Sequence, residues 1–158
     1  KGTIYLHFKN KRELFFSCLI AEKRELLPQL EIIENFPEEE RLKAFLEVTF
    51  SFALTASLTR ALLSRRQDFA ALIEEIDATI LKNHDQNFTE YVINKLISPV
   101  THNLDTDDKK TITNVINLAT LAIGYLPEMA FDLPGQEIRT DEFVRTLAMI
   151  IDRGIKNT

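Results

Sequence analysis

A shortage of turn-forming residues limits what this chain can fold into more than any other feature. Four Gly and five Pro among 158 residues leave little material for turns, so few and long elements are expected. Apolar residues recur at spacings of three and four, and no convincing stretch alternates with a period of two. The sequence therefore predicts an all-α fold. A 45% apolar content is enough for the sizeable core of one soluble domain.

The first expected helix begins at Lys11. Asn10 is its expected N-cap, and Glu13 three residues on completes a capping-box pattern. The helical pattern continues to residue 33. Pro28 lies within it and should kink the helix, because proline lacks the N–H donor and clashes with the preceding turn.

The later helices are marked by similar signals. A first-turn proline followed by acidic residues opens the second helix at Pro37, where negative charge complements the helix dipole. Asp107 and Thr140 are the expected N-caps of the last two helices. The expected ranges are 37–56, 58–66, 68–98, 108–127 and 140–156.

The last two helices are apolar on more than one face. A surface helix of a monomer needs only one buried stripe, so the surplus predicts a second partner, most simply the same helix pair of another copy. The alternative is that both helices form the centre of a larger bundle. The residues predicted at a homodimer interface are Ile116, Ala119, Ile123, Phe143, Leu147 and Ile151.

Aromatic residues gather on the second helix and on the long helix that follows. Aromatics at helical spacing are usually core, but they can also line an apolar pocket in which a few polar groups orient a ligand. We expect such a pocket to bind a small apolar or amphipathic effector. Its predicted lining residues are Phe50, Leu54, His84, Asn87, Phe88 and Tyr91.

The sequence contains no recognisable catalytic or metal-binding constellation. Its three histidines lie far apart, and it has no Glu-x-x-His pair and no cysteine cluster. We therefore expect no enzyme activity and no cofactor. Cys18, amid apolar residues, is expected to be a buried and inert thiol. No apolar run reaches membrane-spanning length, so a cytoplasmic protein without membrane contact is expected.

The charge of the chain is distributed unevenly. Six Lys or Arg against two Glu give residues 1–24 a formal charge of +4, so the other 134 residues sum to −9 of the net −5. A polyanion would therefore be met at the N-terminal end only. If residues 3–8 are helical, Ile4 and Phe8 lie on an inner face, while polar and aromatic side chains suited to a DNA groove lie elsewhere. The free N–H groups at the start of the next helix suit a phosphate.

The same N-terminal residues resemble part of a known protein family. The stretch "GTIYLHFKNKREL", residues 2–14, resembles the recognition-helix segment of the tetracycline-repressor (TetR) family. The remainder is similar in architecture to that family's ligand-binding and dimerisation domain. The resemblance implies a homodimeric transcriptional repressor that leaves its operator DNA when a small molecule enters the helical domain.

The resemblance also implies roles for individual residues. Thr3, Tyr5 and His7 would contact operator DNA, and Lys11 would hold a phosphate at the start of the connecting helix. Gly2 would allow close approach of the turn, and Lys1 would add a backbone contact; these six residues form the predicted DNA-binding set, Lys1, Gly2, Thr3, Tyr5, His7 and Lys11.

The sequence departs from the family's pattern at its N-terminal end. The family places two further helices before this segment, so we interpret residues 1–34 as a truncated helix-turn-helix with its connecting helix, and 35–158 as the ligand-binding and dimerisation bundle. A recognition helix depends on the preceding helices for its angle to the groove, so residues 1–158 alone should bind operator poorly. A helical carrier or lipid-binding protein is the alternative function.

Overall fold

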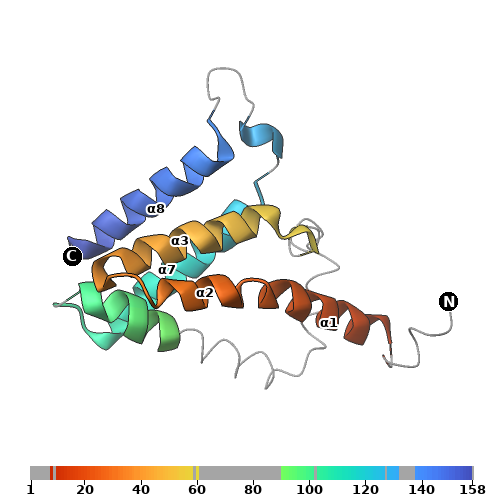
Figure 1. Cartoon of the computed structure of the whole chain (residues 1–158), viewed down its shortest axis with the longest axis horizontal. Coiled ribbons are helices and arrows are strands. Elements are labelled where there is room, and N and C mark those ends of the chain that lie inside the picture. Colours follow the sequence, from red (N-terminus) through yellow and green to blue (C-terminus); the bar gives the residue numbers. More distant parts are fainter. Residues whose placement is uncertain are drawn as a thin grey trace.

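The computed structural model describes residues 8, 10–58, 60, 90–101, 103–126, 128–131 and 138–157. These residues are mostly helical and include no strand, which confirms the all-α prediction for this part of the chain. Figure 1 shows the helices stacked side by side, with α1 extending beyond the others toward the N-terminus. Most of the long helix expected over 68–98 lies outside the described residues.

Two helices replace the single helix expected over residues 11–33. These are α1, Lys11–Arg24, and α2, Leu27–Ile33, with Pro28 as the second residue of α2. Proline is tolerated there because a first-turn N–H has no partner within the helix. The predicted cap at the start of α1 is confirmed, since the backbone N–H of Glu13 donates to Asn10 Oδ1 at 2.9 Å.

The third helix, α3, spans Glu38–Thr55 and is the centre of the structure. It contacts α2, α7 and α8, and in Figure 1 it lies between α2 and α8. Its buried residues recur every three or four positions, and they form the middle of the core: Leu42, Phe45, Leu46, Thr49, Phe50, Ala53 and Leu54. The boundaries predicted from Pro37 and Ala56 are confirmed, because these two residues flank the helix.

The long helix expected over 68–98 is described only at its C-terminal end. There the structure has a π-helix, η2, Val92–Ile97, followed by the 3₁₀ turn η3, Ser98–Val100. Pro99 lies in that turn, close to the end predicted for the helix. Val92, Leu96 and Ile97 are at most 1% exposed and join the core beside α3. A π-helix is rare and occurs mostly as a single turn within an α-helix.

The last two long helices are α7, Thr106–Gly124, and α8, Thr140–Lys156, with the 3₁₀ turn η4, Glu128–Phe131, between them. The cap predicted for α7 was wrong by two residues. Asp105, not Asp107, is the N-cap, and its Oδ1 accepts the N–H groups of Asp107 and Asp108 at 2.8 Å each. Thr140 was also assigned wrongly: it is the first residue of α8, and Arg139 occupies the cap position without a side-chain bond.

The C-terminal end of α8 is fastened to the start of α3. The Lys156 ammonium donates to the backbone carbonyl of Glu39 and lies 2.8 Å from Asp152 Oδ2. The two helices are therefore antiparallel, as Figure 1 shows. Asp152 is buried while Lys156 is partly exposed, so the ion pair lies at the edge of the core.

Candidate functional site

The predicted DNA-binding segment lies almost entirely outside the described residues. This holds for five of its members, Lys1, Gly2, Thr3, Tyr5 and His7. Lys11 is the first residue of α1, directly behind the Asn10 cap. The DNA-binding roles of all six residues stay predictions.

The residues predicted to line a ligand pocket fall into three groups. Phe50 and Leu54 are 0% and 5% exposed and pack within the core, and their contact with a ligand stays a prediction. Tyr91, the residue directly before η2, is half-buried and packs against the core. The other three, His84, Asn87 and Phe88, lie outside the described residues.

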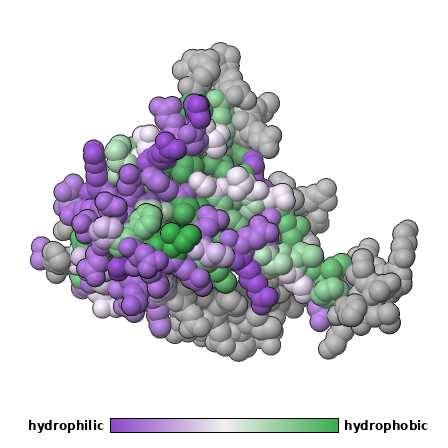
Figure 2. All heavy atoms as spheres, in the orientation of Figure 1, coloured by the Kyte–Doolittle hydropathy of each residue, from purple (hydrophilic) through white to green (hydrophobic). Residues whose placement is uncertain are grey.

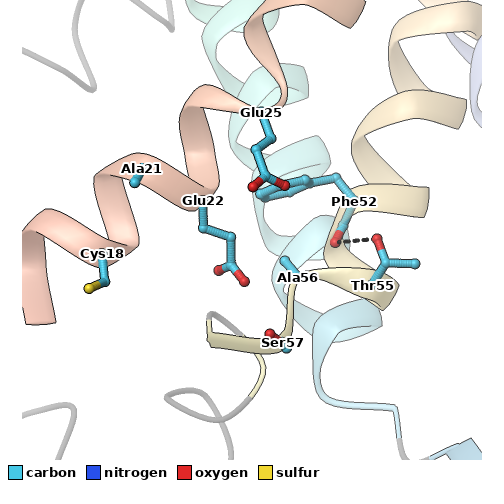
Figure 3. Close-up of a pocket in the computed structure, with 8 residues that line it drawn as sticks. All are labelled: Cys18, Ala21, Glu22, Glu25, Phe52, Thr55, Ala56 and Ser57. Atoms are coloured by element: carbon cyan, nitrogen blue, oxygen red, sulfur yellow. Dashed lines mark hydrogen bonds between the residues drawn. The ribbon is translucent and has the colours of Figure 1, made fainter.

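The structure contains a cleft among the described residues that adjoins α3. It has a volume of about 380 Å³ and lies between α1 and the C-terminal end of α3. In Figure 3 the side chains of Glu22 and Glu25 extend toward Phe52 and Ala56 on the opposite wall. The described lining residues are Cys18, Ala21, Glu22, Glu25, Phe52, Thr55, Ala56 and Ser57.

Glu22, one of the lining residues, joins α1 to the residues after α3. Its Oε1 accepts the backbone N–H of Leu58 at 2.8 Å, across 36 positions of sequence. Arg60 then joins the same region to α7, since its guanidinium donates to the carbonyls of Leu54 at 2.6 Å and Leu126 at 2.8 Å. The position of α1 is thus coupled through side chains to the C-terminal ends of α3 and α7.

The expectation for Cys18 was wrong. The structure places this cysteine, the only one of the sequence, at an exposed position on the cleft rather than in the core. Sequence inspection missed the cleft because its lining residues come from two separated stretches and share no motif. The one available signal was Glu22 and Glu25, which lie three positions apart and so face the same way from a helix.

Tyr91 links the π-helix to the end of α2. Its pKa lies above the ordinary value of 10.0, first because burial disfavours the phenolate, and then because Glu34 repels negative charge and accepts the phenol's hydrogen bond. Arg41 opposes the shift. The neutral phenol is therefore the form that the folded state favours.

This shift predicts a decline in stability at alkaline pH. Because the pKa of Tyr91 is raised on folding, its contribution is fully present below the unfolded-state pKa, about 10, and is lost as the pH rises through the folded-state pKa. Tyr91→Phe should flatten that decline in urea unfolding measured across the alkaline range. In an absorbance titration, Glu34→Gln should lower the pKa of Tyr91. A Tyr91→Phe variant with an unchanged alkaline decline would contradict this assignment.

The surplus apolar surface predicted for α7 is present. One stripe of the helix faces the core and includes Ile116 and Ile123, which are 2% and 4% exposed. Another faces outward and consists of Val115, Leu118, Leu121 and Tyr125, which are 43–66% exposed. Ile116 and Ile123 are thus buried within the single chain. We therefore predict instead that the four outward-facing residues, called here the α7 outer stripe, contact the second copy.

The prediction for α8 needs less revision. Phe143, Leu147 and Ile151 are half-buried, as is Ala119 of α7. Ile150, which was not predicted, is the most exposed apolar residue of α8, at 58%. The ring of Phe143 packs edge-on against Phe131 of η4, with ring centroids 5.3 Å apart. Contact of these residues with a second copy stays a prediction.

Other sites were sought among the described residues. None of the groupings of His, Cys, Asp and Glu in this part of the chain could hold a metal ion. Within the same ranges, the helices are too short or too polar to cross a membrane. Comparisons with protein-family models, curated proteins and solved structures returned no match.

Proposed function

We propose that the chain is a TetR-like DNA-binding transcriptional regulator, a repressor that acts as a homodimer and leaves its operator when a small molecule binds the helical domain. The observation that carries the proposal is the capped start of α1 directly behind the stretch "GTIYLHFKN". A recognition helix followed by a tight turn and a new helix needs a helix start at this point, and Asn10 provides it.

Two further features support the proposal. The cleft beside α1 offers a ligand a place next to the helix that leads to the proposed DNA-binding segment. The outward apolar residues of α7 and α8 offer a surface for a second copy, and operator recognition by such proteins requires two DNA-binding units in fixed relation.

The test uses the protein as its gene encodes it. Fragmented genomic DNA from the source organism is passed over the protein, and retained fragments are sequenced. We expect enrichment of fragments that share an inverted repeat, because a two-fold symmetric dimer reads two half-sites. No enriched fragment at low salt would contradict the regulator. Ligand binding without DNA binding would favour the alternative, a helical carrier.

Lys11 and Tyr5 give the sharper prediction once an operator is known. Lys11→Ala should weaken binding about equally for all sequences and reduce the salt slope by about one, because a phosphate contact is sequence-independent. Tyr5→Ala should weaken operator binding by about 1–3 kcal/mol and relax specificity, because a base-edge contact is lost. Gel-shift titrations at several salt concentrations measure both. Unchanged operator affinity in both variants would contradict the proposed contacts.

A further inference from the structure

A new helical turn begins directly where α3 ends. Ala56 belongs to both, because its N–H donates to the carbonyl of Phe52 at 2.8 Å and its own carbonyl accepts the N–H of Arg60 at 2.9 Å. The second bond joins residues four apart, and Ser57, Leu58 and Arg60 are helical; they form the post-α3 turn. Ala56 therefore occupies the N-cap position of this turn, with a non-helical backbone (φ −66°, ψ 92°) that suits a cap.

The side chain in this cap position cannot act as a cap. Alanine has no oxygen atom to accept the N–H groups that the first turn of a helix leaves without helical partners. The acceptor comes instead from α1. Oε1 of Glu22 accepts the N–H of Leu58, the second residue of the turn, at 2.8 Å, which is the kind of bond that a capping side chain makes. Figure 3 shows the Glu22 side chain extending from α1 toward Ala56 and Ser57.

The described side chains of α1 give this helix little support of their own. None of them is buried, and in Figure 2 hydrophobic as well as hydrophilic residues of α1 lie at the surface. A cleft of about 380 Å³ lies between α1 and the end of α3. Because α1 ends at Arg24 and α2 begins at Leu27, no continuous helix fixes the direction of α1. A side chain that reaches across the cleft is therefore placed to set this direction.

The post-α3 turn is also tied to α7. Arg60 donates from its guanidinium to the carbonyl of Leu54 at 2.6 Å and to that of Leu126 at 2.8 Å. These carbonyls lie at the C-terminal ends of α3 and α7, where the helix dipole favours a cation. The ends of α1, α3 and α7 are therefore joined through one helical turn.

We propose that Glu22 is an interhelical cap that fixes the direction of α1. With the Glu22–Leu58 bond made, α1 is held beside the end of α3 and the post-α3 turn has its cap. With the bond broken, α1 turns at residues 25–26, which lie between α1 and α2. Glu22 is thus a positioning residue of the helical domain, and this role does not depend on DNA binding.

Hydrogen exchange at the amide of Leu58 tests the bond itself. In the full chain, Glu22→Ala should speed this exchange at least about fivefold, the effect expected when a capping side chain is removed. Glu25→Ala removes the same charge from the same wall of the cleft and is the matched control, which should exchange as the unmodified chain does. An unchanged rate after Glu22→Ala, or an equal gain in the control, would overturn the cap.

The direction of α1 is measured by fluorescence quenching across the cleft. Cys18 is exposed on α1 and is the only cysteine of the chain, so a bimane label attaches there alone, and the sequence contains no tryptophan. Phe52→Trp places one quenching indole on the opposite wall. In this labelled chain, Glu22→Ala should lower the quenched fraction at least about twofold, because α1 no longer stays beside the end of α3. Quenching that persists unchanged would refute the proposal.

A local cap separates support of the turn from positioning of α1. Ala56→Ser supplies a hydroxyl group that accepts N–H groups of the post-α3 turn. When it is combined with Glu22→Ala, exchange at Leu58 should return to within about twofold of the unmodified chain, while the quenched fraction stays low. Serine caps the turn without holding α1. Recovery of the quenching as well would show that Glu22 only stabilises the turn, and its positioning role would be wrong.

The conservative variant Glu22→Gln completes the test. Glutamine keeps an acceptor oxygen at the same reach, so this variant should retain most of the quenching and most of the protection of the Leu58 amide. Losses as large as those of Glu22→Ala would contradict the assignment to this hydrogen bond. None of these measurements includes DNA, so a failure to find an operator would contradict the proposed function and leave the interhelical cap standing.

Discussion

Phe50→Ala should lower the free energy of unfolding by about 3–5 kcal/mol, the usual loss when a fully buried phenylalanine is truncated. Phe50 is 0% exposed and lies in the C-terminal half of α3, in the core cluster to which α2, η2, α7 and α8 also contribute. Removal of its ring leaves a cavity that a helix held by neighbours on several sides cannot collapse to fill. Urea unfolding followed by circular dichroism measures the change.

Phe52→Ala is the matched control, because it changes the same side chain two positions along the same helix. Phe52 is half-buried on the wall of the cleft, so we expect a smaller loss of about 1–2 kcal/mol. The pair also separates packing from binding: ligand affinity should fall in the Phe52 variant. Equal stability losses in the two variants would contradict the placement of Phe50 in the core and of Phe52 on the cleft.

Leu118→Glu should raise the dissociation constant of the homodimer by about 100-fold or more, because a charge without a partner would be buried at the contact. Leu118 is the most exposed member of the α7 outer stripe, at 66%, so the substitution should leave the fold of the single chain unchanged. Analytical ultracentrifugation at micromolar concentration should show a dimer for the unmodified chain and a monomer for the variant.

Ser51→Glu is the control for Leu118→Glu. It adds the same charge at an exposed position of α3, outside the α7 outer stripe, and should leave the dimer intact. If the unmodified chain sediments as a monomer at micromolar concentration, the α7 outer stripe does not form a homodimer interface. Dissociation of both variants alike would point to a general effect of charge rather than to this surface.

Local signals in the sequence predicted local structure well. Asn10 caps α1, and Pro28 marks an interruption, because both effects depend on residues within a few positions. The cap of α7 shows the limit of such signals. Asp105, Asp107 and Asp108 are all suitable residue types in one short stretch, and only the backbone conformation selects Asp105.

The surfaces of the helices could be predicted only in part. Periodicity showed that α7 has more apolar residues than one stripe requires, but it could not tell whether Ile116 or Val115 faces inward, since both are apolar and adjacent. That choice is made by α3, which lies against the side that holds Ile116. The cleft could not be predicted at all. Its walls come from α1 and from the end of α3, so it depends on how two distant parts of the chain are placed.

The π-helix at Val92–Ile97 has a consequence for chains of different length. Hydrogen bonds of a π-helix join residues five apart rather than four, so this stretch holds one residue more than regular α-helix would. Loss of one residue here would therefore restore regular helix and leave the side chains on both sides, including Tyr91, close to their present directions. The same loss within α3 would turn every later residue by about 100° and remove the core face. Alignments of homologous genes should therefore place a one-residue gap in this stretch while Tyr91 keeps its counterpart.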